Sequence, residues 1–186
     1  MDLILWELIR AAGLIAFGLL TLSVFMGVAV NARALDGVMK RAWANEVHGT
    51  AAVLGAVFIA MHVGLVLVDQ YVPFSPVAVL VPLASNWRPW PVAAGIVSLY
   101  LATTLLVSTY LRPAIGHRTW RLIHYGGFLG WAAALLHGIT AGSDAGVAWM
   151  QYLYLLAGGA VALVTIFRVL APSPSASGGL PASRHP

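Results

Sequence analysis

The sequence is organised as a series of apolar runs, each close to twenty residues long, separated by short polar or basic segments. A helix of about 20 apolar residues is long enough to span the hydrocarbon core of a bilayer. Five such runs are present, at 11–31, 44–68, 91–111, 119–140 and 147–169. The pattern therefore predicts an all-α integral membrane protein, a bundle of about five transmembrane helices.

Composition agrees with this interpretation, because 60% of the residues are hydrophobic and 9% are charged. A soluble domain is about 45–50% apolar and about 25% charged. The chain has no cysteine, which excludes disulfides, thiolate metal sites and iron–sulfur clusters bound through its own thiolates.

The two ends of the chain are interpreted differently from the runs between them. Segment 1–10, MDLILWELIR, lacks a basic n-region and a small-residue cleavage site, so we take it as an interfacial lead-in to the first helix. Segment 171–186 is rich in Pro, Ser and Gly and cannot bury enough apolar surface to order itself. We expect a transmembrane domain over 1–170 and a disordered cytoplasmic tail over 171–186.

The basic residues divide unevenly between the two sides that five alternating spans create. Eight of the ten lie on the side of the C-terminus: Arg33, Lys40, Arg41, Arg112, Arg118, Arg121, Arg168 and Arg184. Arg10 and Arg88 lie on the other side. Because basic residues collect in cytoplasmic loops, we expect the C-terminus in the cytoplasm and the N-terminus outside, in a bacterial inner membrane. The confinement of these charges to span ends argues against nucleic-acid binding.

Four histidines interrupt two of the apolar runs, where an imidazole is costly unless it has a partner. His48 and His62 are fourteen residues apart in the second run, and His124 and His137 are thirteen apart in the fourth. These two spans run in the same direction, so the histidines form two pairs at two depths, roughly 20 Å apart along the helix axis. Two facing imidazoles suit the axial positions of a six-coordinate haem iron. The pattern predicts haem sites between the second and fourth helices.

Zinc and proton transfer explain the same pairs less well. Protein zinc sites need three or four neighbouring ligands, whereas the two histidine-bearing runs contain no Cys or Asp and one Glu, Glu46, near the start of the second run. Proton relays usually include carboxylates, which the middle of the spans lacks. The thirteen-residue spacing places His137 about 140° around an ideal helix from His124. The fourth helix must therefore tighten, tilt, or present its histidines to differently rotated haems.

Over residues 40–145 the chain resembles the ferric reductase-like transmembrane domain family, whose relatives include the haem-bearing membrane portion of NADPH oxidases. The resemblance rests on the two histidine spacings, on GHRTWRLIHYGGFLGWAAALLHGITAGSD and on the loop DQYVPFSPVAVLVPLASNWRP. It implies two b-type haems stacked across the membrane, which carry electrons from the cytoplasm outward. By this resemblance His48 and His124 would hold the cytoplasmic-side haem, and His62 and His137 the outer one.

Three arginines are candidates for binding the cofactor's anionic groups. Arg118 and Arg121 lie near the cytoplasmic-side histidines in sequence, where a guanidinium could meet a haem propionate. Arg88 lies in the outer loop and could face the outer propionates or an anionic acceptor.

The electron donor is expected to be a separate molecule. No GxGxxG fingerprint follows a strand in this sequence, so we expect this chain to bind no flavin and no NAD(P). The expected donor is a cytoplasmic flavoprotein or a membrane quinol, and the acceptor is extracytoplasmic. The chain would then be an oxidoreductase-type electron-transfer subunit, and whether it is itself an enzyme is left open. Alternatives are the haem-bearing subunit of a periplasmic methionine sulfoxide reductase system, or a non-redox transporter or scaffold.

Overall fold

The computed structural model describes residues 3–170, and every regular element in that range is a helix. The helices are α1 (Leu3–Ala32), α2 (Arg41–Val68), α3 (Pro76–Leu80), α4 (Pro89–Tyr110), α5 (Arg112–Ala141) and α6 (Ala148–Leu170). All except the five-residue α3 are long and apolar enough to cross a membrane. The five spans expected from the apolar runs are thus present, as an α-helical membrane bundle.

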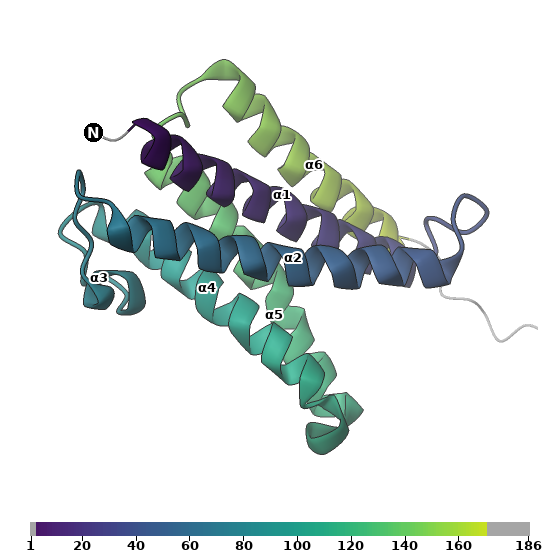
Figure 1. Cartoon of the computed structure of the whole chain (residues 1–186). Coiled ribbons are helices and arrows are strands. Elements are labelled where there is room, and N and C mark those ends of the chain that lie inside the picture. Colours follow the sequence, from purple (N-terminus) through teal and green to yellow (C-terminus); the bar gives the residue numbers. More distant parts are fainter. Residues whose placement is uncertain (1–2, 171–186) are drawn as a thin grey trace, which may run out of the picture.

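Two antiparallel hairpins, α1–α2 and α4–α5, form most of the bundle, and α6 lies beside α1 (Figure 1). We call the end with the α1–α2 turn, the α4–α5 junction and the C-terminal end of α6 the basic end. The other end, with the start of α1 and with α3, is the far end. Towards the basic end the α4–α5 hairpin diverges from α1, α2 and α6 (Figure 1).

Helix α1 is the centre of the packing, because it contacts α2, α5 and α6. Ala12, Ala16 and Ala29 of α1 are almost fully buried, and small residues of this kind let membrane helices approach closely. Phe17 packs edge-on against Tyr154 of α6, with ring centroids 5.4 Å apart. By contrast, α6 leaves many large apolar side chains exposed, as expected of a surface that faces lipid.

The structure corrects two boundaries. The expected interfacial lead-in is helical from Leu3 onward, so α1 has 30 residues and a length of about 45 Å, longer than a hydrocarbon core. The expected loop between the third and fourth spans is also mostly helical, because α4 ends at Tyr110 and α5 begins at Arg112. Pro113 suits the first turn of a helix, and the chain bends at Gly116, whose φ is 77°.

Helix α3 was not predicted, because a single turn has no hydrophobic periodicity to detect. Ser75 caps it by accepting a hydrogen bond from the Ala78 backbone N–H at 3.2 Å, and Pro76 fills the first turn. This turn packs against α2 and α4 at the far end. The expected tail, 171–186, lies outside the described residues.

Candidate functional site: two histidine pairs

The four histidines of the apolar runs meet in two pairs between α2 and α5. These helices run in the same direction (Figure 1), yet no Cα atom of α2 lies within 8 Å of one in α5. The imidazoles reach across this space. The ring centroids of His48 and His124 are 5.8 Å apart, and those of His62 and His137 are 6.3 Å apart. We call the first the basic-end pair and the second the far-end pair.

The ring separations suit two imidazoles on opposite sides of one metal ion. A metal lies about 2 Å from a ligating imidazole nitrogen, which is itself about 1 Å from the ring centre, so two opposed ligands have centroids about 6 Å apart. The planes of the two rings are inclined by 72° in the basic-end pair and by 77° in the far-end pair. The two rings of each pair are therefore steeply inclined to one another and are not stacked.

Three of the four rings are fixed through the same atom. In each of the three, Nδ1 donates a hydrogen bond to a backbone carbonyl. His48 donates to the carbonyl of Ser23 at 2.7 Å, and His62 donates to that of Ile9 at 2.9 Å. His137 donates to the carbonyl of Pro91 at 2.8 Å. A carbonyl only accepts, so Nδ1 of a neutral ring carries the proton and Nε2 keeps a free lone pair. Metal-ligating histidines are held in this way by their second nitrogen.

Three glycines provide the space that these same rings occupy. A Cβ at Gly27 would lie 3.1 Å from the ring of His48, one at Gly13 would lie 3.1 Å from His62, and one at Gly95 would lie 2.8 Å from His137. These glycines were not among the predicted site residues, because they lie on α1 and α4, outside the helices that carry the histidines. One signal was available: Gly13 and Gly27 are fourteen residues apart, the same spacing as His48 and His62 on the antiparallel neighbour.

The thirteen-residue spacing on α5 is accommodated without a break between the two histidines. The one non-helical residue within α5 is Gly116, which precedes both. His137 faces α4, where Pro91 and Gly95 contact its ring. His124 instead stacks on Trp120 of its own helix, at 4.6 Å. Both rings nevertheless reach their partners on α2, with centroids 5.8 Å and 6.3 Å apart.

A cavity of about 480 Å³ surrounds the far-end pair. Most of its lining is apolar and comes from all five long helices, and four charged residues contribute to it: Arg10, Asp69, Arg88 and Asp144. Ligand sites in proteins typically have volumes of about 300–1,000 Å³ and a mainly apolar lining with a few polar groups. The far-end pair therefore lies in a space whose size and mainly apolar lining suit a bound ligand.

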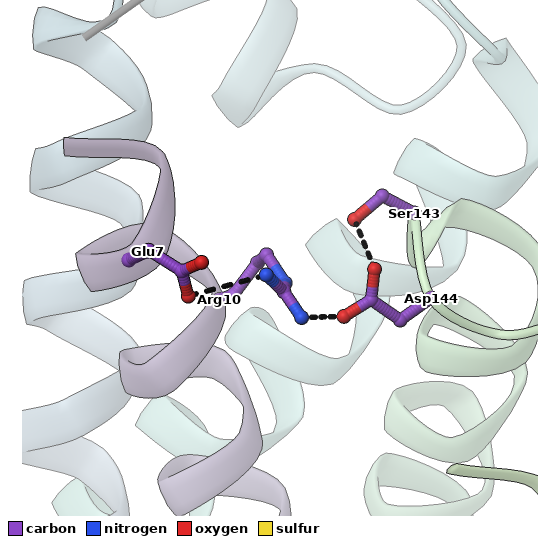
Figure 2. Close-up of polar contacts among 4 residues, drawn as sticks. All are labelled: Glu7, Arg10, Ser143 and Asp144. Atoms are coloured by element: carbon purple, nitrogen blue, oxygen red, sulfur yellow. Dashed lines mark hydrogen bonds and ion pairs between the residues drawn. The ribbon is translucent and has the colours of Figure 1, made fainter. Parts of the chain in front are cut away.

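Two arginines of this cavity tie neighbouring elements together at the far end. Arg10 of α1 forms an ion pair with Asp144, in the loop before α6, and a second with Glu7 at 3.2 Å (Figure 2). Arg88, one of the arginines expected to bind a cofactor, donates to the carbonyl of Thr140 at 2.9 Å. Its backbone is in the left-handed region, with φ of 43°, at the N-cap of α4.

The other two arginines predicted to bind a cofactor, Arg118 and Arg121, lie on exposed turns of α5 before His124. Neither Arg118 nor Arg121 forms a side-chain hydrogen bond or an ion pair with another residue of the range 3–170. Their predicted role toward haem propionates stays a prediction.

Each histidine pair offers two protein ligands and no more. Within residues 3–170 no group of three or more His, Cys, Asp or Glu side chains is placed to hold a metal ion. A metal between either pair would need further ligands from a bound group, and a haem supplies four equatorial nitrogens. The residues present therefore fit a haem better than a bare metal ion.

Comparison with protein-family models, curated proteins and solved structures finds no match to this chain. The resemblance to the ferric reductase-like domain accordingly rests on the sequence motifs alone.

Proposed function

We propose that this protein is a dihaem cytochrome b that transfers electrons across the membrane. One observation carries the proposal: two imidazole pairs bridge the space between α2 and α5, with centroids 5.8 Å and 6.3 Å apart. A single intramembrane histidine has many structural explanations. Two histidine pairs at two depths, with three Nδ1 atoms bonded to carbonyls, support the proposal that these histidines would hold two haems.

In this proposal the chain holds and orients the cofactor, and the bound haem supplies one-electron chemistry. His48 with His124, and His62 with His137, would hold one haem per pair through their Nε2 atoms. The carbonyls of Ser23, Ile9 and Pro91 keep the opposite nitrogens protonated and the rings in one orientation. The lining around the far-end pair is mainly apolar, and the polarity of its surroundings influences the potential of a haem.

Electrons would enter at the basic end and leave at the far end. The basic end carries most of the cationic residues, which by the positive-inside tendency is the cytoplasmic side. The proposed donor is a separate flavoprotein or quinol and the proposed acceptor is extracytoplasmic. An acidic donor surface would be attracted to the arginines at the start of α5, so its rate of electron transfer should fall as ionic strength rises.

A visible spectrum tests the cofactor directly. The full chain, produced with haem supplementation and purified in detergent, is measured in the oxidised and dithionite-reduced states, and haem is quantified per chain. We expect a low-spin b-type spectrum and two haems per chain. Absence of a Soret band would refute the cytochrome proposal, and one haem per chain would refute its dihaem form.

Cysteine labelling tests the proposed direction. The chain has no cysteine, and Asn86 at the far end and Ala114 at the basic end are both exposed. In intact cells Asn86→Cys should react with a membrane-impermeant thiol reagent, and Ala114→Cys should react only after lysis. The reverse pattern would invert the electron path.

A further inference from the structure

His124 differs from the other three histidines of the pairs in how its ring is held. Its Nδ1 is buried and has no hydrogen-bond partner within residues 3–170. No glycine with a contacting Cβ position is found beside its ring in that range, in contrast to the other three. Instead the indole of Trp120 stacks on it, with ring centroids 4.6 Å apart and planes inclined by 25°.

Trp120 is itself held on several sides. Its Nε1 donates to the Thr109 hydroxyl of α4 at 3.3 Å. The guanidinium of Arg112 lies 4.5 Å from the indole centroid, and the ring of His117 stacks on the indole at 5.5 Å. An indole anchored in this way offers a fixed surface to a neighbouring ring, because stacked aromatic rings and cation–π contacts both restrict its rotation.

The local sequence explains how these groups meet. Trp120 precedes His124 by four residues, so the two side chains lie on the same face of α5. Gly116, with φ of 77°, bends the chain just before this turn, and Arg112 comes back over the indole. A Cβ at Gly116 would contact nothing within 4 Å, so this glycine is needed for its backbone conformation.

We propose that Trp120 is the positioning residue of His124, holding the ring by stacking where a backbone carbonyl holds the other three. The inference rests on the proposed function, since positioning matters only if His124 ligates iron. It also implies that the basic-end pair is connected to the protein surface, because Arg112 and His117, which contact Trp120, are both exposed.

The test compares variants of the full haem-loaded chain by two measurements: the rate at which each haem is lost to excess apomyoglobin, and the electron paramagnetic resonance of each ferric haem. Removing a partner that orients a metal ligand typically costs 10–100-fold in metal affinity. Trp120→Leu should therefore speed loss of the basic-end haem by about tenfold and shift its resonance, leaving the far-end haem unchanged. Trp120→Phe, which keeps a stacking ring, should stay within about threefold of the wild type.

Two further variants control for general damage. Trp43→Leu removes an exposed tryptophan from the first turn of α2, also at the basic end, and should change neither haem. Thr109→Val removes the indole's hydrogen-bond partner and should speed loss of the basic-end haem about twofold to threefold. This variant tests the proposal even if Trp120→Leu does not fold.

The outcomes separate the two proposals. A wild-type chain that binds no haem would refute the proposed function and this inference with it. A wild-type chain with two haems, and a Trp120→Leu chain with both haems unchanged, would refute the role of Trp120 alone. Equal changes at both haems would also refute it, because they would show a general destabilisation.

Discussion

The two histidine pairs have similar ring separations but are built by different means. In the far-end pair both Nδ1 atoms donate to backbone carbonyls, and both rings lie against a glycine of a neighbouring helix. In the basic-end pair His48 has such support, whereas His124 rests on Trp120. The other three rings are each restrained by a hydrogen bond and by the close backbone of a neighbouring helix, whereas the ring of His124 is restrained by one stacked side chain. We therefore expect the far-end pair to be the more rigid of the two.

The two ends of the bundle also differ in how closely their helices are held together. At the far end, Arg10 ties α1 to the loop before α6, and Arg88 ties the start of α4 to the end of α5. At the basic end the α4–α5 hairpin diverges from the other helices (Figure 1). Cross-links at one end and divergence at the other agree with a pair held firmly at the first and less firmly at the second.

The largest expected effect tests whether the pairs are independent. Replacing His62 or His137 by Ala should remove one haem, and replacing His48 or His124 by Ala should remove the other, because each iron loses an axial ligand. Redox titration of the four variants should show loss of one or the other component. His117→Ala is the control and should keep both haems, since His117 belongs to neither pair. Loss of the same component in His48→Ala and His62→Ala would refute the pairing.

The second prediction concerns the glycine beside His137. A Cβ at Gly95 would lie 2.8 Å from the Nδ1 of His137, so Gly95→Ala should displace the ring from the Pro91 carbonyl. We expect the affinity for the far-end haem to fall about 10–100-fold, as when a ligand's orienting partner is lost. Gly64→Ala on α2 is the control, because a Cβ there would contact nothing within 4 Å. Retention of both haems by Gly95→Ala would show that the glycine has no part in the site.

The third prediction compares the two haems of the unmodified protein. If one side-chain stack is a weaker support than a carbonyl and a glycine, the basic-end haem should leave first. With excess apomyoglobin as haem acceptor, we expect its loss to be up to about tenfold faster than that of the far-end haem. The component lost first is identified from the histidine variants. Faster loss of the far-end haem would reverse the comparison drawn here.

Much of the architecture was predictable because it depends on patterns within single segments. Apolar runs of membrane-spanning length indicated the five long helices, and alternation of direction placed His48 opposite His124 and His62 opposite His137. The structure shows both of these juxtapositions. The expected start of the first helix at residue 11 was wrong, because α1 begins at Leu3. The composition of segment 1–10 does not show whether the helix already includes it.

The supports of the histidines were not predictable, because they depend on which helix each ring faces. The carbonyls of Ile9, Ser23 and Pro91 have no side-chain signature at all. From the sequence alone, a tryptophan at a span end such as Trp120 is expected to belong to the aromatic belt at the membrane interface. Its stacking on His124 depends on the bend at Gly116 and on Thr109 of another helix.

The smallest expected effect concerns the ion pair between Arg10 and Asp144 at the far end (Figure 2). The two side chains are 23% and 17% exposed, so the pair is partly shielded from water, and pairs near a surface typically contribute about 1 kcal/mol or less. Arg10→Gln and Asp144→Asn should each lower the unfolding midpoint in detergent by a few degrees at most. The double variant should be less destabilised than the sum of the two single variants, with a coupling free energy of about 0.5–1 kcal/mol.

Glu7, which is 64% exposed, provides the matched control, and Glu7→Gln should have no measurable effect. Strict additivity of Arg10→Gln and Asp144→Asn would show that this contact does not contribute to holding the far end together, and the rigidity of the far-end pair would then rest on its backbone carbonyls and glycines alone.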